Sequence, residues 1–434
     1  METRQKFTSR LATILTMVGV AVGLGNVWRF PYMMGKYGGS AFLIVFLFFA
    51  LVFAIPAVMG EWALGRTTRQ GPPGAFVAIW GSTGGRIAGT LLLFTVFVAE
   101  SYYMLVIAYL TTTAILGTSI GFGPEQLTII SGHVGNGWQQ FGVALVLMTL
   151  TVLVVLRGLR GGIEKLSVFI VPVFGIIVVI LIGYTLSLEG ALDQLAAFLK
   201  PDFSEITKPT NLFAAMGQAI FSLSLGGTFF VIYGSYLRDD EDLRISALWT
   251  GLGDVGAALL ASLFLVPAIL VFGLELGQGP GLVLETLPRL FGEMPYGRVV
   301  GSFFLFGLVL IAFLSSLAAV QVVVGAVVDF WKIPLKKAAI VVGVAEMALL
   351  LPVALNPEWI GRLDLFFGSG MQCVGCILAL LALTWGLGSQ GAKEALFGKT
   401  AEPRFANFTL FWLRWVIPGV LLLVLGMYIV EQVQ

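Results

Sequence analysis

Charged residues are scarce in this sequence, and histidine and cysteine are scarcer still. Only 11% of the 434 residues are Asp, Glu, Lys or Arg, whereas an ordinary globular domain carries about 25%. The formal net charge is +1 and no basic cluster exceeds a few residues, so the chain lacks the positive surface that a nucleic acid would need. We therefore expect no nucleic-acid partner.

The residue types that most often support catalysis or bind a transition metal are too few for either role. The single histidine, His133, lies in a polar stretch and is expected at the surface. Cys373 and Cys376 are three positions apart, a spacing that can mark a redox or metal pair, but no second pair or histidine accompanies them. No nucleophile has a base beside it. We expect buried free thiols, no enzyme activity and no organic cofactor.

Apolar residues, in contrast, make up 58% of the chain. They form stretches of about 20 residues, long enough to cross the lipid bilayer as helices, and they do not alternate with polar residues as barrel strands would. We therefore predict an all-α polytopic membrane protein, with residues 1–434 as one transmembrane domain. The predicted spans, eleven in number, are residues 11–34, 40–65, 87–117, 141–157, 166–187, 210–236, 244–274, 297–330, 338–355, 360–387 and 406–430.

The basic residues between these spans are unevenly distributed and predict the orientation, because Lys and Arg favour cytoplasmic loops. A cytoplasmic N-terminus places most of them inside, and an odd number of spans then places the C-terminus outside. The basic residues left in outer segments are Lys36, Lys200, Lys208, Arg289, Arg298 and Arg362.

Two spans contain polar residues and clustered glycines near mid-membrane depth. The first reads VGVAVGLGNVWRFP, and the sixth reads QAIFSLSLGGTFFVIYGSY. Small residues can simply allow close helix packing. Their placement five spans apart instead favours an inverted repeat with two broken helices, in which repeat one covers about 10–187, repeat two about 210–387 and an extra helix about 406–430. Unwound backbone at the breaks would offer carbonyls to a cation and N–H groups to an anion.

At this point the sequence resembles the neurotransmitter:sodium symporter family. RLATILTMVGVAVGLGNVWRFPYMMGKYGGSAFLIVF and IPAVMGEWALGR resemble its first two helices, and the similarity extends to GQAIFSLSLGG, YGSYLRDDEDL, LSSLAAVQ and Asp329. The resemblance covers nearly the whole chain. It implies the leucine-transporter-like fold, five plus five helices, and sodium-coupled amino acid uptake by alternating access. It also implies a prokaryotic inner membrane as the location.

The resemblance implies a substrate site at the two breaks. Donors for the substrate carboxylate would be the N–H groups of Leu24 and Gly25 and the hydroxyl of Tyr103, although a tyrosine in an apolar span more often only packs. Acceptors for the ammonium would be the carbonyls of Ala21, Phe221 and Ser222 and the hydroxyl of Ser224. Unpaired charges at this depth would be costly, so both ends of a zwitterion need partners.

The residues around the substrate side chain predict its size. The matching positions are Val20, Ala99, Phe221, Gly227, Ser315 and Ala319. The leucine transporter has bulkier residues at three of them, Ala99, Gly227 and Ala319, so the resemblance implies a bulky hydrophobic or aromatic substrate. Alternatively, Gly227 serves only to unwind the helix and a neighbouring side chain refills the space. Gly23 leaves room for a carboxylate that the substrate itself carries.

The resemblance also implies one or two sodium sites. The ligands of the first would be Ala21, Asn26, Ser222 and Asp254, of which the carboxylate of Asp254 would otherwise stand unpaired in the membrane. The second would use Gly19 and Val22 with Ser315 and either Ile311, in an ungapped register, or Ala312 and Ser316, in a register shifted by one residue. The ungapped register puts Leu314 where the family has a hydroxyl or a carboxylate.

Two charge pairs resemble the gates of the family. Arg29 and Asp364 would form the outer pair, with Phe221 and Tyr103 as an aromatic lid. The inner latch would consist of Arg4 and Asp329 together with Phe7 and Tyr236. Pairs that form in one state and break in the other suit alternating access, whereas static surface pairing would contribute little.

The sequence supports other functions of a membrane protein less well. A channel needs a continuous polar pathway, whereas the polar residues here converge on one depth. Proton coupling through Asp254 or Glu100 is the main rival within transport. A membrane sensor that transports nothing is another alternative. Glu346 has no role that the resemblance supplies.

Overall fold

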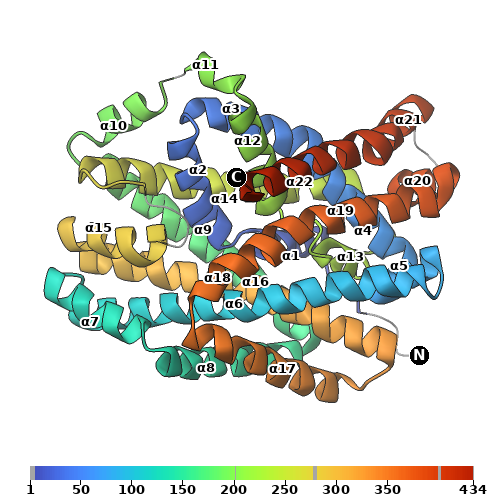
Figure 1. Cartoon of the computed structure of the whole chain (residues 1–434), viewed down its shortest axis with the longest axis horizontal. Helices are drawn as coiled ribbons and strands as arrows, with labels where there is room; N and C mark the ends of the chain where they lie inside the picture. Colours follow the sequence, from blue (N-terminus) through green and yellow to red (C-terminus); the bar gives the residue numbers. More distant parts are fainter. Residues whose placement is uncertain (1–4, 201, 277–280, 399–401, 434) are drawn as a thin grey trace.

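The computed structural model describes residues 5–200, 202–276, 281–398 and 402–433. Across these ranges the chain is a bundle of helices, most of which run along the long axis of the molecule (Figure 1). The helices that connect the spans, or extend them at the surface, are α5 (Pro72–Trp80), α7 (Pro124–Val134), α10 (Ala191–Phe198), α11 (Phe203–Ile206), η4 (Leu282–Thr286), α15 (Leu287–Glu293) and α20 (Gly388–Phe397).

Long apolar helices confirm the predicted membrane fold. Among the described residues, nine are long and apolar enough to cross a membrane, and a bent pair near the N-terminus makes a tenth. The nine are Ser40–Thr68 (α3, η2 and α4), Gly84–Ile120 (α6), Gly137–Val155 (α8), Leu159–Leu186 (η3 and α9), Leu243–Val271 (α14), Gly297–Trp331 (α16), Leu335–Leu355 (α17), Glu358–Gly386 (α18, η5, α19 and η6) and Pro403–Met427 (α21, η8 and α22). The remaining predicted span corresponds to two short helices, α12 (Pro209–Ser222) and α13 (Phe229–Gly234).

The first span is broken where the sequence is rich in glycine. Helix α1 (Arg10–Ala21) begins at Ser9, whose side chain accepts a hydrogen bond from the Ala12 N–H. After a short break the chain continues as η1 (Gly25–Arg29) and α2 (Phe30–Lys36), bent by 63° relative to α1. Val22 has an extended backbone (ψ 115°), so the helical hydrogen-bond ladder stops there and frees backbone groups.

The sixth span is broken at a similar place in its own sequence. Helix α12 (Pro209–Ser222) and helix α13 (Phe229–Gly234) are joined by a turn in which Gly226 has φ +79°. This positive φ suits glycine. A side chain here would also clash, because an added Cβ would lie 1.7 Å from the Gln372 carbonyl oxygen. The Glu61 carboxylate on α4 (Ile55–Thr68) accepts the Gly226 N–H at 2.7 Å and so satisfies one freed donor.

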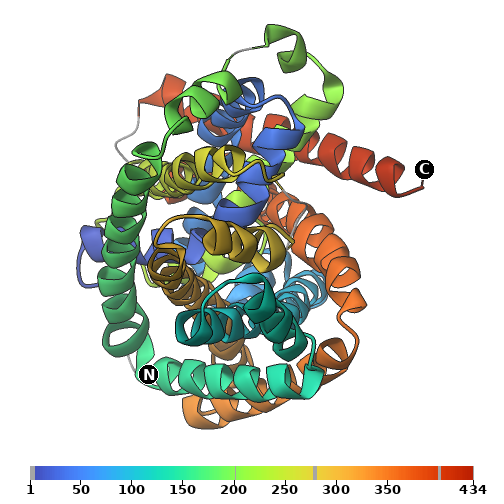
Figure 2. The ribbon, with the colours of Figure 1, turned by 90° about the vertical axis from the view of Figure 1, so that its left-hand side faces the viewer.

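The two breaks lie against α6 and α16, the longest helices of the bundle. Helix α6 packs directly against α16, and α16 also contacts α1 and α13. The C-terminal helix α22 (Ile417–Val433) extends at the edge of the bundle, as the end-on view in Figure 2 shows. The resemblance predicted a substrate site at the two breaks, and the breaks lie in the centre of the bundle.

Close packing of α4 on α13 yields a first prediction. An alanine at Gly65 would place its Cβ 1.9 Å from the Val231 carbonyl oxygen. Because a backbone atom cannot yield cheaply, we expect Gly65→Ala to destabilise the protein by about 1–3 kcal/mol and to lower its thermal unfolding midpoint in detergent. Gly142→Ala on α8 is the control, since nothing lies within 4 Å of the added carbon. Equal midpoints for the two variants would contradict this packing.

Candidate functional site

A cavity of about 120 Å³ lies between the two breaks. A single water needs about 10–15 Å³, so the space admits several waters or a small solute. Every residue predicted to bind the substrate lines this cavity: Val20, Ala21, Gly23, Leu24, Gly25, Ala99, Tyr103, Phe221, Ser222, Ser224, Gly227, Ser315 and Ala319. The fold thus brings together residues from both breaks, α6 and α16. Their role in binding remains a prediction.

The glycines of the first break allow close approach of aromatic and hydroxyl groups. An added Cβ on Gly25 would lie 2.7 Å from the Phe221 ring, and one on Gly23 would lie 3.0 Å from the Tyr103 oxygen and 3.2 Å from Ser315 Oγ. The Tyr103 oxygen is 3.5 Å from the Leu24 nitrogen. Backbone donors and a hydroxyl therefore converge where the substrate carboxylate is predicted.

On the opposite wall, the acceptors predicted for the ammonium are partly engaged already. The Phe221 carbonyl accepts the N–H of Ser224 at 2.9 Å and also the N–H of Leu223. A carbonyl oxygen has two lone pairs, so in this conformation an ammonium would compete with these two N–H groups for the Phe221 carbonyl.

Three side chains of the predicted first sodium site form one buried network. Asp254 on α14 accepts from the Asn26 amide at 2.8 Å and from the Ser222 hydroxyl at 2.6 Å. The other end of the Asn26 amide accepts the Gly23 N–H at 3.0 Å. All three side chains are at most 3% exposed. Carboxylate, amide and hydroxyl oxygens are the ligands that hard cations prefer, so the donor set fits a sodium ion.

Ser315 and Ser316 point in different directions, which bears on the second sodium site. The Ser315 hydroxyl is 3.0 Å from the Val22 carbonyl oxygen and 3.4 Å from that of Gly19. The Ser316 hydroxyl instead donates to the Glu100 carboxylate at 2.5 Å. The geometry therefore favours the ungapped register over the one that used Ser316.

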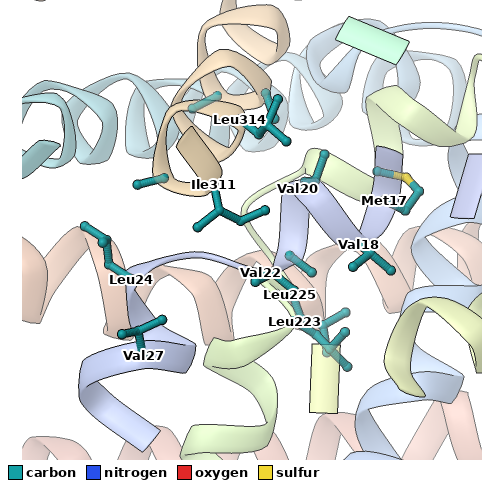
Figure 3. Close-up of a cluster of buried hydrophobic side chains, with 14 of the residues drawn as sticks. Met17, Val18, Val20, Val22, Leu24, Val27, Leu223, Leu225, Ile311 and Leu314 are labelled. Atoms are coloured by element: carbon teal, nitrogen blue, oxygen red, sulfur yellow. The ribbon is translucent and has the colours of Figure 1, made fainter. Parts of the chain in front are cut away.

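In that register the second site has an apolar residue where the resemblance implies a hydroxyl or carboxylate. Ile311 and Leu314 project from α16 toward Val20 and Val22, as Figure 3 shows. An added Cβ on Gly19 would lie 3.1 Å from a terminal carbon of Leu314. An alkyl group cannot coordinate a cation, so the predicted second site would have fewer side-chain oxygens than the predicted first site.

The predicted outer gate is not closed. Arg29 and Asp364 are both described, and they do not form an ion pair in this structure. The Arg29 guanidinium instead lies 4.1 Å from the centroid of the Phe221 ring and 3.5 Å from Ser369 Oγ. Asp364 accepts from the Tyr102 hydroxyl at 3.1 Å. The predicted ion pair between Arg29 and Asp364 is therefore absent in this conformation. Each of the two side chains contacts a neutral or aromatic neighbour instead.

Inner contacts, in contrast, are made. Phe7 is buried and its N–H donates to the Tyr236 carbonyl at 3.1 Å, and Asp329 accepts the Gly71 N–H at 3.0 Å. Arg4, its predicted partner, lies outside the described residues. Lys6, which the sequence did not single out, pairs with Asp239 at 2.5 Å, and this hydrogen bond holds the pKa of the Asp239 carboxyl below its usual value.

Several cavity residues were missed from the sequence. Thr95, Val96, Phe229, Phe367, Gly368 and Gln372 also line the space. Helix α6 already pointed to this cavity through Ala99 and Tyr103, so a helical repeat of three to four residues could have found Thr95 and Val96. Phe229 begins α13, directly after the second break, and belongs to the glycine-rich span that the sequence had already marked. Phe367 and Gly368 lie on η5 (Asp364–Gly370) and Gln372 lies on α19 (Met371–Leu381). Their position depends on helix packing that no sequence pattern marks.

Comparison with known proteins agrees with this geometry. The model of the sodium:neurotransmitter symporter family matches residues 4–120 and 122–433. An uncharacterized sodium-dependent transporter of Bacillus subtilis is 30% identical over 74% of this chain and 72% of its own length. One from Methanocaldococcus jannaschii is 30% identical over 90% of this chain and 84% of its own length.

A solved structure is also similar over almost the whole chain. The crystal structure of MhsT in complex with L-phenylalanine matches with a TM-score of 0.87 at 29% identity, and the match covers 97% of this chain and 99% of MhsT. The predicted leucine-transporter-like fold is confirmed by this match.

The open pair at Arg29 and Asp364 generates a second prediction. If the pair closes over an occupied cavity, Asp364→Ala should reduce accumulation of a labelled amino acid in proteoliposomes at least tenfold. Equilibrium sodium binding should change little, because Asp364 does not contact the network around Asp254. Glu358→Ala on the exposed surface of α18 (Glu358–Leu363) is the matched control. Normal accumulation by Asp364→Ala would remove the gate assignment.

Proposed function

Because the chain belongs to the sodium:neurotransmitter symporter family, whose members are membrane transporters and not enzymes, we propose that it is a sodium-coupled amino acid symporter. Membership implies sodium-dependent transport. The finer proposal is that the substrate is a bulky hydrophobic or aromatic amino acid and that at least one sodium ion, at the Asn26, Ser222 and Asp254 network, accompanies it by alternating access.

One observation supports this proposal above the others: the predicted substrate and sodium groups share the same stretch of backbone. Leu24 and Gly25 face the cavity, and Asn26, the next residue, joins Ser222 and Asp254. An ion at that network would place positive charge near the substrate carboxylate. Each ligand would then favour binding of the other, and such coupling is reciprocal by thermodynamic necessity.

The side-chain end of the cavity supports a large substrate. Ala99 and Ala319 face it from α6 and α16, and MhsT, which is similar over almost the whole chain, was solved with L-phenylalanine. An aromatic side chain can bury about 150–250 Å², which is worth roughly 4–6 kcal/mol at about 25 cal/mol per Å². At Gly227 the alternative interpretation applies in part, because the Phe229 ring occupies space beside it: an added Cβ on Gly227 would lie 2.6 Å from that ring. The support for a large substrate therefore rests on Ala99 and Ala319.

Substrate size is tested by competition. We expect tryptophan, tyrosine, phenylalanine and leucine to inhibit uptake of labelled leucine at least tenfold more strongly than glycine or alanine. Ala319→Ile should shift preference toward small substrates by filling the cavity from α16. Gly227→Phe should do the same, although it must also displace the Phe229 ring. If glycine or alanine outcompetes tryptophan in the native protein, the proposed preference is wrong.

The ion requirement follows from the fixed carboxylate of Asp254. Because sodium is the proposed coupling ion, uptake should stop when choline replaces sodium at constant pH. Because the Asp254 carboxylate would balance the sodium charge, uptake should continue when gluconate replaces chloride. Asp254→Asn should lower sodium affinity at least tenfold or create a chloride requirement. Thr250→Val, one turn away on α14, is the control because it removes a buried hydroxyl that has no partner among the described residues. A native protein that stalls without chloride would contradict this account.

Two buried carboxyl groups favour proton coupling as a second candidate. Glu100 lines the cavity, and Glu346 on α17 is fully buried with neither carboxylate oxygen bonded to a described residue. A proton on either carboxyl would avoid burying its charge within the membrane. Uptake that persists in choline and follows a pH gradient would favour this candidate. Sodium-stimulated binding without any uptake would instead indicate a sensor.

Location and orientation complete the proposal. The chain is a multi-pass membrane protein, and its bacterial and archaeal relatives support a prokaryotic inner membrane. The distribution of Lys and Arg supports a cytoplasmic N-terminus and an external C-terminus.

A further inference from the structure

The two adjacent glycines of the second break exclude a side chain for different reasons. At Gly226 the backbone does so, because φ is +79° and an added Cβ would lie 1.7 Å from a backbone oxygen. Gly227 does not have a positive φ. Beyond its chain neighbours, an added Cβ there would first meet the Phe229 ring, at 2.6 and 2.7 Å, and then the Ser224 carbonyl oxygen at 3.5 Å, an ordinary contact distance. The ring of Phe229 is therefore what excludes a side chain at position 227.

Phe229 is also accessible from the central cavity. It lines this cavity together with Gly227, and its side chain is only partly buried. The next residue on α13, Phe230, is fully buried with its ring centroid 5.7 Å from that of Trp62, and it does not line the cavity. Of these two neighbouring phenylalanines, Phe229 is thus the one that a solute in the cavity can touch.

The location of the ring matters because the sequence predicted that position 227 faces the side chain of the substrate. A ring that fills the volume of the missing side chain would meet the substrate at the same place. The alternative is that the ring only fills packing space and contributes to stability alone. The two possibilities differ in whether a change at Phe229 alters the relative affinity for substrates of different size.

We propose that Phe229 is a specificity-determining residue whose ring takes the place of a side chain at position 227 as one wall of the subsite for the substrate side chain. The ring then limits how large a side chain the subsite accepts, and Ala99 and Ala319 provide the remaining room. This inference rests on the proposed function, which it deepens. Apolar subsites discriminate between substrates by the volume that each side chain fills.

The experiment moves the ring from position 229 to position 227. Tryptophan and leucine compete against uptake of labelled phenylalanine in proteoliposomes, and the ratio of their potencies is compared between variants. Phe229→Ala opens the subsite and should raise the potency of tryptophan relative to leucine by about threefold or more, whereas Gly227→Phe crowds it and should lower this ratio by about threefold or more. The double variant should return to within about twofold of the native ratio, because a ring again fills the same volume.

A conservative exchange and a matched control assign the effect to the ring. Phe229→Leu should shift the ratio in the same direction as Phe229→Ala, but by less. Phe230→Leu makes the same exchange one position further along α13, outside the cavity, and should leave the ratio unchanged even where it lowers the thermal unfolding midpoint. A native ratio in Phe229→Leu overturns the inference even if no other variant can be purified, and so does a double variant that is no closer to the native ratio than the single variants.

The outcome also separates this inference from the proposed function. If phenylalanine is taken up with sodium but the ratio does not respond to changes at position 229, only the assignment of Phe229 fails. If neither phenylalanine nor leucine is taken up, the proposed function fails and the inference fails with it.

Discussion

Two membrane helices are broken, and each break leaves backbone N–H and carbonyl groups unpaired. The need to pair these groups is the constraint on which the rest of the structure depends. Within a bilayer such groups must find partners inside the protein. Three side chains supply them: Glu61 accepts the Gly226 N–H, Asn26 accepts the Gly23 N–H, and Ser315 donates to the Val22 carbonyl. The bond from Asn26 is local, whereas Glu61 and Ser315 come from distant helices, so these two contacts also tie the bundle together.

The same arrangement explains why an ion and a solute would bind as a unit. Asn26 satisfies the backbone of the first break with its amide oxygen and reaches Asp254 and Ser222 with its amide nitrogen. A cation that enters this network must reorganise those bonds, and the adjacent N–H groups of Leu24 and Gly25 would respond. Positive charge and freed donors at one place suit a carboxylate.

Much of this could be predicted from the sequence, because hydropathy and glycine placement act locally. The long apolar stretches gave the spans, and the glycines near residues 23 and 226 marked the breaks, since helices there lose their ladder. Details set by packing between distant helices could not be predicted. Examples are the separation of Arg29 from Asp364, the turn of Ser316 toward Glu100, and the position of Gln372, each of which depends on how one helix is rotated against another.

The most direct test of coupling at the breaks is equilibrium binding of labelled tryptophan to the purified protein over a range of sodium concentrations at constant pH and ionic strength. The account predicts that sodium raises tryptophan affinity at least tenfold, equivalent to about 1.4 kcal/mol, and that Asp254→Asn abolishes most of this increase. Tryptophan affinity that is the same with and without sodium in the native protein would contradict it.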